Sequence, residues 1–415
     1  MLRSLSVRVV IALLLGLGLG AAAAAAAFGG PQTKSVSEMV EAVGSLWLNA
    51  LRMTVVPLIF AVMVTGIAGV ADAAATGRLA IRALLLIAFM MVVSACFALG
   101  FAQVFYAIWP VTGAAAAALR AGATAAPDVA KAAPTFVGFV SGLAPGNVLK
   151  AASQDAILPL VVFAAFFGFA VTRLPDDRRA AFTAIFQSLG DVMISIVRWV
   201  LFAAPIGVFA LALGVGLRAG VGAAGVIAHY VTAIVLGNLG MTLVAYVMAL
   251  IAGVNLRKFA NAVAPVQVTA FATQSSLACL PAMIERCRDE LDVPDRVSGL
   301  VLPLAVSIFR ITGPVANFGV ALFVVQVYGL HPTAMQYLGA TFVAVATSMA
   351  SVGLPGQVSF FASIAPICLS FGLPVDLLPI LIAVEVIPDI FRTVGNVTGD
   401  MAITKMLARG EPAAV

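Results

Sequence analysis

The stretch DIFRTVGNVTGD, from Asp389 to Asp400, decides the fold class of this 415-residue chain. Arg392, Asn396 and Asp400 follow Asp389 at three, seven and eleven residues, so the four side chains share one face of a helix, with Glu385 one turn earlier. The surrounding sequence is apolar, and at about 1.5 Å per residue this polar face spans roughly half of a bilayer's hydrocarbon core. Charges at that depth usually mark a binding or conduction site. The alternative is a set of ion pairs that only joins helices.

The composition is that of a polytopic membrane protein. Hydrophobic residues make up 62% of the chain and charged residues 10%, whereas about a quarter of the residues of a soluble domain are charged. Eight apolar stretches, most of them longer than the roughly 20 residues that a spanning helix needs, predict eight transmembrane helices. They run from about Val9 to Phe28, Leu46 to Val70, Ile81 to Trp109, Phe136 to Val171, Val192 to Leu213, Val221 to Val254, Leu300 to Val327, and from Leu377 past Ile390. We interpret the first stretch as a membrane helix rather than a signal peptide, because no soluble domain follows it.

Basic residues predict the orientation, because cytoplasmic loops carry an excess of Lys and Arg. They flank alternate stretches and both ends of the chain: Arg3, Arg8, Arg78, Arg82, Arg173, Arg178, Arg179, Arg257, Lys258, Lys405 and Arg409. Both termini are therefore expected in the cytoplasm, with the protein in a bacterial cytoplasmic (inner) membrane. The net charge of +5 follows from this topology, so we expect no nucleic-acid partner.

Nothing in the sequence indicates a metalloenzyme or a hydrolase. The four cysteines have no CxxC or Cys/His spacing, and the chain has only two histidines, His229 and His331. We expect no transition-metal site, no catalytic residues and no enzymatic cofactor. Ser275 or Ser276 could serve an intramembrane enzyme only with a nearby base, and no convincing His or Lys stands at membrane depth.

Two interrupted segments predict re-entrant helical hairpins. The first runs from Lys258 to Arg296, has Ser275-Ser276 at its centre and is charged at both ends, which places both ends on one side of the membrane. The second runs from residue 333 to residue 371 and turns at SVGLPG, residues 351–356. Irregular backbone at membrane depth is tolerated only where protein or water satisfies it, so a central polar site is expected. The alternative is two kinked transmembrane helices.

Pro314 predicts a break in the apolar stretch from Leu300 to Val327. Proline cannot donate a backbone hydrogen bond, so the carbonyl of Arg310 is expected to be left free, and Gly313 adds local freedom. A broken helix beside two hairpins is typical of transporters that bind a ligand near the bilayer midplane. The first hairpin with the broken helix and the second hairpin with the last helix form a pair of inverted repeats by pattern.

These residues resemble the dicarboxylate/amino acid:cation symporter family, the glutamate and aspartate transporters, over nearly the whole chain. The most specific match is the last helix, where DIFRTVGNVTGD keeps the family's Asp, Arg-Thr, Asn and Asp in register. Further stretches are similar to the second, fourth and fifth helices and to the two hairpin tips: LRMTVVPLIFAVMVTGIAG (51–69), residues 154–171, APIGVFAL (204–211), SSLACLP (275–281) and SVGLPG (351–356).

The resemblance implies a homotrimer in which a rigid scaffold holds a mobile transport domain that moves by an elevator mechanism, with the second hairpin as outer gate. Scaffold helices 1 and 2 are expected in residues 1–75, and scaffold helices 4 and 5 in residues 111–215. The transport domain is expected to combine helix 3 in residues 76–110 with helix 6, hairpin 1, helix 7, hairpin 2 and helix 8 in residues 216–415.

The resemblance also assigns roles to the polar face. Arg392 would hold a substrate carboxylate as a planar fork, and Asp389 would accept the substrate's amino group. The predicted substrate-binding set is Arg392, Asp389, Thr393, Asn396, Ser275, Ser276, Gly353 and Arg310, and the predicted cation-binding set is Asp400, Asn396, Ser307 and Ser348. The coupling cation is expected to be Na⁺ or H⁺.

The chain departs from the family where sodium should bind. The family motif Asn-Met-Asp-Gly-Thr in the seventh helix is replaced by Phe309-Arg310-Ile311-Thr312-Gly313. Val92 and Val93 stand where the third helix should carry hydroxyl groups. Hard cations need oxygen ligands, which Phe, Ile and Val side chains cannot provide.

Arg310 suggests what replaces the missing sodium sites. We hypothesise that its guanidinium faces Asp400 or the substrate as a tethered cation and takes over part of the sodium dependence. The alternative is that Arg310 only forms a structural ion pair with Asp400 or Glu385.

The sequence thus predicts a secondary active transporter, a symporter for acidic amino acids or C4-dicarboxylates with reduced or altered sodium coupling. Asp389 favours an amino acid such as glutamate or aspartate, because a plain dicarboxylate would place a like charge beside it. The alternatives are a sodium-independent carrier of another small anion or amino acid (proton-coupled, exchange-type or passive) and an anion-conducting channel.

Overall fold

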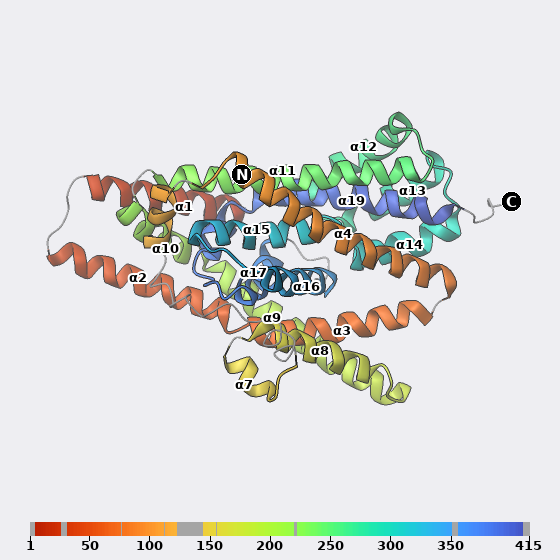
Figure 1. Cartoon of the computed structure of the whole chain (residues 1–415), viewed down its shortest axis with the longest axis horizontal. Helices are drawn as coiled ribbons and strands as arrows, with labels where there is room; N and C mark the ends of the chain where they lie inside the picture. The colour runs from red at the N-terminus through yellow and green to blue at the C-terminus, as the bar shows by residue number, and fades with distance from the viewer. Residues whose placement is uncertain are drawn as a thin grey trace.

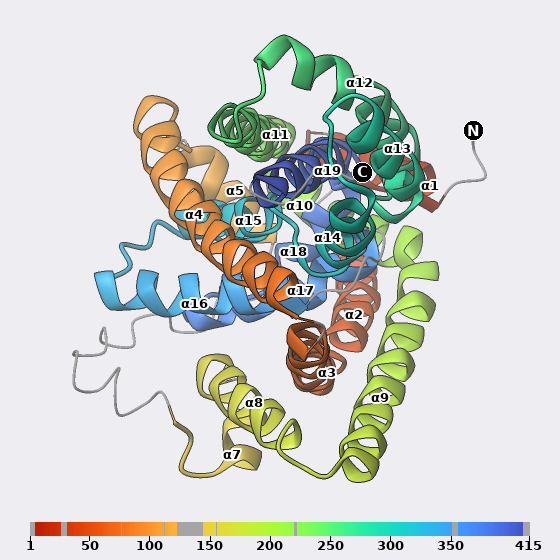
Figure 2. The same ribbon diagram turned by 90° about the vertical axis from the view of Figure 1, so that its right-hand side faces the viewer.

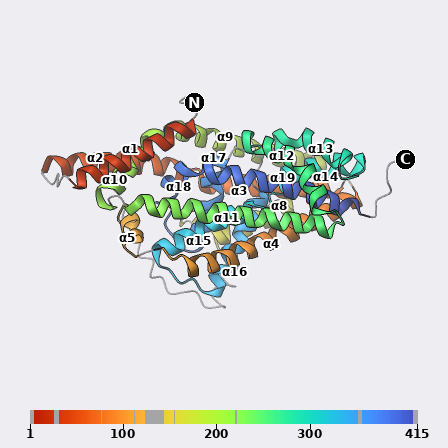
Figure 3. The ribbon, with the colours of Figure 1, turned by 90° about the horizontal axis from the view of Figure 1, so that it is seen from above.

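The computed structural model describes residues 5–25, 31–75, 77–111, 113–122, 144–154, 156–219, 222–350 and 356–409. All regular secondary structure in these ranges is helical, which confirms the all-α prediction. The molecule is an elongated bundle whose long helices α4 (Arg78–Ile108), α11 (Gly222–Ile251) and α19 (Val386–Ala408) run along its longest axis (Figures 1 and 3). Seen from one end, these three helices lie in one part of the bundle, away from α8 (Ile157–Val171) and α9 (Asp176–Phe202) (Figure 2).

The remaining helices complete the bundle in chain order. They are α1 (Leu5–Ala25), α2 (Pro31–Arg52), α3 (Val55–Ala75), α5 (Gly113–Gly122), α7 (Val148–Ser153), α10 (Ala204–Ala219), α12 (Leu256–Thr273), the 3₁₀ turn η1 (Leu277–Cys279), α13 (Leu280–Asp289), α14 (Asp295–Ile308), α15 (Gly313–Tyr328), α16 (Ala334–Ala350), α17 (Gly356–Ser370) and α18 (Leu378–Val384).

Four helical stretches of the described chain are long and apolar enough to cross a bilayer. They are α4, α9, the Gly225–Ile251 part of α11, and α14 together with α15 over Asp295–Tyr328. Shorter apolar stretches lie in α1, α3, α8 and α10, over Ile11–Ala23, Val56–Gly69, Pro159–Val171 and Ala204–Leu217. The protein is therefore an integral membrane protein, whereas the total of eight spans stays a prediction.

Several predicted apolar stretches are each divided between two helices, among them the last one, where α18 ends at Val384 and α19 begins at Val386. The stretch 46–70 is shared by α2 and α3, and the stretch 192–213 is shared by α9 and α10. Pro57 and Pro205 lie in the first turns of α3 and α10, where a missing N–H costs nothing, so each proline starts a new helix. The expectation of continuous helices was wrong there, because apolar content alone does not report such an interruption.

Both predicted hairpins are pairs of packed helices. α12 packs against α13, and α16 packs against α17. Their position as re-entrant elements in the bilayer stays a prediction. The tip of the second hairpin, residues 351–355 with Gly353, lies outside the described residues, as do residues 136–143 of the fourth predicted stretch.

Glycine sets the contact between α1 and α10 at one end of the bundle (Figure 1). A Cβ atom at Gly16 would lie 2.7 Å from the carbonyl oxygen of Phe209, and one at Gly216 would lie 2.5 Å from that of Leu17. Any larger residue would push the two backbones apart. Small residues that allow such close approach are a common way to join helices in membranes, where apolar burial gives little driving force.

Two tryptophans anchor other helix contacts. The indole N–H of Trp47 on α2 donates to the Val200 carbonyl oxygen of α9 at 2.7 Å. Trp109, directly after α4, stacks on His229 of α11 with ring centroids 4.4 Å apart.

The predicted break between α14 and α15 is confirmed. α14 ends at Ile308 and α15 begins at Gly313, with Pro314 in its first turn. The carbonyl of Arg310 accepts a hydrogen bond from the Gly313 amide at 2.7 Å, so the expectation that this carbonyl is left free was wrong. A tight turn supplies the donor that the proline cannot.

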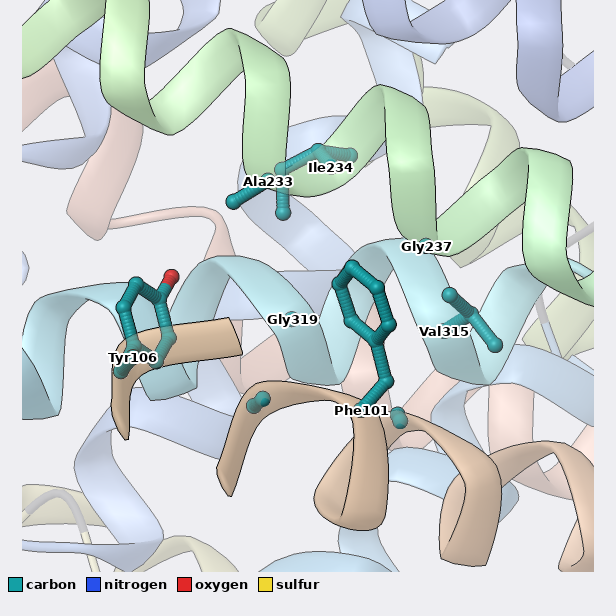
Figure 4. Close-up of a pocket in the computed structure, with 9 residues that line it drawn as sticks. Phe101, Tyr106, Ala233, Ile234, Gly237, Val315 and Gly319 are labelled. Carbon is teal, nitrogen blue, oxygen red and sulfur yellow. The ribbon is translucent and has the colours of Figure 1, made fainter. Parts of the chain in front are cut away.

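Helix α15 lies in the interior and lines a small apolar cavity with α4 and α11 (Figure 4). Phe101 and Tyr106 of α4 face this cavity, opposite Gly237 of α11 and Gly319 of α15. A Cβ atom at Gly319 would lie 3.0 Å from the Ile234 side chain, so α11 and α15 are already close. With no charged side chain in its lining, this cavity is a packing gap rather than a site for an anion.

Candidate functional site

Helix α19 carries the predicted polar face into the interior of the protein. Asp389, Arg392, Thr393 and Asn396 are each at most 5% exposed, and Asp400 is fully buried. α19 packs against α11, α12 and α14, so these side chains lie among helices. Polar groups in such a place are stable only when other protein groups, water or a ligand satisfy them.

Seven residues of the predicted substrate-binding set line one cavity. They come from three parts of the chain: Ser275 and Ser276 from the first hairpin, Arg310 from the broken helix, and Asp389, Arg392, Thr393 and Asn396 from α19. Gln274, Leu277 and Val306 complete the lining. The structure thus brings together residues that are up to 121 positions apart in the sequence, counted from Ser275 to Asn396.

A strained turn forms the tip of the first hairpin. α12 ends at Thr273, and Gln274 then adopts a left-handed conformation with φ of 51°. The hydroxyl of Ser275 accepts a hydrogen bond from the Ala278 amide at 3.3 Å, which closes the turn before α13. Non-glycine residues rarely adopt positive φ, and such strain is concentrated at functional sites.

Thr312 joins the broken helix to α19. Its hydroxyl lies 2.8 Å from the Arg392 carbonyl oxygen and 2.7 Å from Asn396 Oδ1, and its amide donates to the same Oδ1 at 3.1 Å. These hydrogen bonds fix the Asn396 side chain and hold the turn between α14 and α15 against the middle of α19.

Ser94 of α4 also reaches the break in the helix. It is fully buried and its hydroxyl donates to the Ile311 carbonyl oxygen at 2.5 Å. Val92 and Val93 themselves carry no hydroxyl, as the sequence shows, and the hydroxyl that reaches the break comes from the residue directly after Val93.

Arg392 is held between two carboxylates. Its Nη2 forms an ion pair with Glu385 Oε1, and its Nη1 lies 3.6 Å from Asp389 Oδ1. Glu385 is fully buried and also accepts a hydrogen bond from the Tyr230 hydroxyl of α11 at 3.0 Å. Glu385 therefore pairs with Arg392.

Arg310 lines the same cavity as Arg392 and Asp389. It is half-buried and interacts with Arg392, Asp389 and Asp400. Neither carboxylate oxygen of Asp400 has a hydrogen-bond partner among the described residues, although both are buried. Asp400 is thus a fully buried carboxyl group without a hydrogen bond to its side-chain oxygens from the described residues.

The other residues of the predicted cation-binding set are placed differently. Ser348 of α16 is fully buried, accepts a hydrogen bond from Asn317 Nδ2 at 3.3 Å and lies against Gly313. Ser307 is exposed, and its hydroxyl donates to the Pro303 carbonyl oxygen one turn back in α14. The structure therefore places Ser348 beside the broken helix and directs Ser307 away from the cavity.

Thr312, Ser94 and Tyr230 were not predicted as members of the site. Thr312 precedes Gly313 and Pro314, a sequence position where a helix often begins with a hydroxyl residue, so helix-start signals could have found it. Ser94 and Tyr230 stand in apolar helices without any local signal, and only the packing of α4 and α11 reveals them.

A broken helix and a hairpin tip that meet a buried arginine in one cavity define a class of protein, the secondary transporters of the membrane. Residues 5–409 match the sodium:dicarboxylate symporter family, and the chain belongs to that family. This confirms the resemblance seen in the sequence, and it makes the protein a transporter rather than an enzyme.

Curated relatives resemble most of the chain. The proton/glutamate-aspartate symporter of Escherichia coli (strain K12) is 26% identical over 388 residues, which cover 91% of this chain and 86% of that protein. The proton/sodium-glutamate symport protein of Bacillus subtilis (strain 168) is 25% identical over 394 residues, 92% of this chain and 88% of that protein. C4-dicarboxylate transport protein 3 of Bradyrhizobium diazoefficiens is 30% identical over 332 residues, 78% of this chain and 72% of that protein.

Proposed function

We propose that this protein is a symporter that carries an acidic amino acid or a C4-dicarboxylate across a bacterial inner membrane. The observation that carries the proposal is the cavity where Arg392, Asp389 and Arg310 meet the tip of the first hairpin. The names of the relatives, which are glutamate, aspartate and C4-dicarboxylate carriers, support this substrate class.

Arg392 is the anchor for a carboxylate of the substrate. Its planar guanidinium can present two N–H groups to two carboxylate oxygens at once. Asp389, 3.6 Å away on the previous turn, is placed to accept the ammonium group of an amino acid. Because both side chains are buried, water screens these interactions little, and a ligand with both charges is favoured over a plain dicarboxylate.

Arg310 and Asp400 alter the sodium coupling. Phe309 and Ile311 are almost fully buried beside Arg310 and offer no oxygen to a cation. Relative to the family motif, Arg310 replaces a neutral residue and Ile311 replaces an acidic one. Together the two replacements raise the local charge by two units, which is the charge of two bound monovalent cations. Transport is therefore driven by protons or by exchange rather than by two or more sodium ions.

The movement that exposes the cavity to each side is an elevator movement. Its mobile part consists of residues 76–110 and 216–415, in keeping with the packing of α19 on α11, α12 and α14 and of α4 on α15. The scaffold of α1–α3, α5 and α7–α10 forms a homotrimer with both chain termini in the cytoplasm. Large apolar side chains on the outer face of α9, Trp199 at 74% and Phe202 at 73% exposure, suit contact with lipid or a neighbouring subunit.

Uptake into proteoliposomes tests the proposal. Labelled glutamate, aspartate and succinate are offered with an inward proton gradient, an inward sodium gradient, or neither. We expect saturable uptake of at least one of these anions without sodium, and a loss of about 100-fold in R392A, because truncation of a buried charge partner costs about 3 kcal/mol. The double variant R310M/I311D is expected to gain sodium dependence.

Two results would overturn separate parts of the proposal. If the unaltered protein takes up none of the three anions, the substrate class is wrong. If uptake requires a sodium gradient with two or more ions per substrate, the substitution of Arg310 for bound sodium is wrong.

A further inference from the structure

The ion pair between Glu385 and Arg392 lies behind the substrate cavity. Arg392 lines the cavity, whereas Glu385 is absent from the lining and is fully buried. Both terminal nitrogens of Arg392 already face carboxylates, because Nη2 pairs with Glu385 and Nη1 lies 3.6 Å from Asp389 Oδ1, so a ligand in the cavity has to compete for them.

Glu385 has two partners among the described residues. One carboxylate oxygen pairs with Arg392 and the other accepts a hydrogen bond from the Tyr230 hydroxyl at 3.0 Å. A buried carboxylate that loses its only cationic partner is left with an uncompensated charge, which is strongly unfavourable, and such a group binds a proton instead.

A substrate carboxylate competes with Glu385 for the same guanidinium. When Arg392 turns its N–H groups toward a ligand in the cavity, the Glu385 oxygen loses its ion pair. The Tyr230 hydroxyl remains, but a neutral donor does not balance a negative charge.

We propose that Glu385 is the proton-binding residue of this transporter and that it takes up one proton from water when a substrate carboxylate displaces it from Arg392. This inference rests on the proposed function. The proton adds to the Glu385 oxygen that Arg392 releases, and the ion pair of Arg392 with Glu385 is exchanged for one with the substrate. When the substrate leaves, Glu385 loses the proton and pairs with Arg392 again.

The charged and titratable groups around Glu385 agree with this role. Arg392 and Asp389 face it from α19 and Tyr230 faces it from α11, while the Tyr106 side chain of α4 interacts with Tyr230. Asp389 is a poorer candidate, because it lines the cavity and can pair with a substrate ammonium group. Asp400 is poorer too, because it does not line the cavity and lies about two helical turns from the exchange at Arg392.

The charge balance also favours a proton. The two arginines and three carboxylates of the described cluster, Arg310, Arg392, Glu385, Asp389 and Asp400, sum to one negative charge. An anionic substrate adds further negative charge to a buried site, and one proton on Glu385 removes one unit of it.

Proton uptake on substrate binding is the direct test. Purified protein in weakly buffered detergent solution is mixed with aspartate, glutamate or succinate, and a pH indicator records the protons taken up. We expect about one proton per bound substrate for the unaltered protein and none for E385Q, which still binds substrate. E285Q is the matched control, because Glu285 is exposed on α13, and it is expected to behave as the unaltered protein.

Transport assays separate proton binding from a merely structural role of Glu385. In proteoliposomes, E385Q is expected to keep substrate exchange while losing accumulation driven by a proton gradient. A residue that only positions Arg392 would lower exchange and gradient-driven uptake together, and that result would overturn the inference.

The unaltered protein provides a test that does not depend on the folding of a variant. If one proton binds with the substrate, the apparent Kd rises tenfold for each unit of pH over the range in which the complex holds the proton and the free protein does not. A Kd that is independent of pH, with no proton uptake, refutes the role of Glu385 even if transport of an acidic substrate is established. Failure to bind all three anions would instead refute the proposed function and this inference with it.

Discussion

Two helix contacts in this protein are built in opposite ways. α1 and α10 meet through glycines, and no side chain at Gly16 or Gly216 separates their backbones. α19 meets the broken helix through side chains, with Thr312 and Asn396 joined by hydrogen bonds. The first contact is held by van der Waals packing, whereas the second also depends on the protonation and ligand state of groups around it.

The difference shows which of the two helix contacts can bind a ligand or a proton. The glycine contact has no group that binds or titrates, so it suits a part of the molecule that should keep one arrangement. The contact of α19 has polar groups that are stable only with partners, so a change of partner at Arg392 can change the arrangement. A site that must release its ligand needs the second kind of contact.

Among the substitutions that test this comparison, the replacement of Gly16 should cause the largest loss of stability. In G16L the new side chain would collide with the Phe209 carbonyl and with Ala212, so we expect the free energy of unfolding in detergent to fall by about 3 kcal/mol. Thermal unfolding followed by circular dichroism measures this loss. G18L is the matched control on the same helix, because nothing lies within 4 Å of a Cβ atom at Gly18. Equal stability of the two variants would show that the close approach of α1 and α10 is not needed.

Removal of the Thr312 hydroxyl should have an intermediate effect, seen more in transport than in stability. T312V loses a hydrogen-bonding group worth about 1 kcal/mol next to Asn396, which corresponds to an increase in KM for substrate of about fivefold. T341V is the control, because the Thr341 hydroxyl donates to the Tyr337 carbonyl oxygen within its own helix. A KM equal in T312V and T341V would contradict a role for Thr312 in holding the site.

The smallest effect is expected at an ion pair on the surface. Lys258 Nζ lies 2.6 Å from Asp292 Oδ2, but the side chains are 48% and 76% exposed, so K258A should change the free energy of unfolding by less than about 0.5 kcal/mol.

The small contribution of this pair should also depend on pH in a defined direction. The hydrogen bond from Lys258 lowers the pKa of the Asp292 carboxyl, so the contribution is present above the ordinary pKa of Asp and is lost as the pH falls through the lowered value. Unfolding measured from neutral to acid pH should therefore show K258A and the unaltered protein converging in acid. A gap that widens in acid would contradict this.

Much of the fold was predictable, because composition and apolar length follow directly from the bilayer. The break before Gly313 was predictable for the same kind of reason, since proline restricts the backbone wherever it stands. The division of two apolar stretches at Pro57 and Pro205 was missed, although the same rule applies to them. Prolines that start helices in a short connection look, in sequence, like prolines inside one long helix.

The site was predictable where its residues share one helix face or stand in a stretch that resembles the family. The spacing along α19 places Asp389, Arg392, Asn396 and Asp400 on one face. The stretch SSLACLP, residues 275–281, marks the hairpin tip by its resemblance to the family. Ser94 and Tyr230 reach the site through the packing of distant helices, which no local pattern reports. The pairing of Arg392 with Glu385 likewise depends on side-chain directions in three dimensions.

The three tryptophans of the chain lie in three different surroundings. Trp47 is buried where α2 meets α9, Trp109 stacks on an imidazole at the end of α4, and Trp199 is 74% exposed on α9. The molecule therefore has optical reporters of its own. Single-tryptophan versions of the protein would separate the emission of the α2–α9 contact from that of the α4–α11 contact, and would follow each during turnover without an added dye.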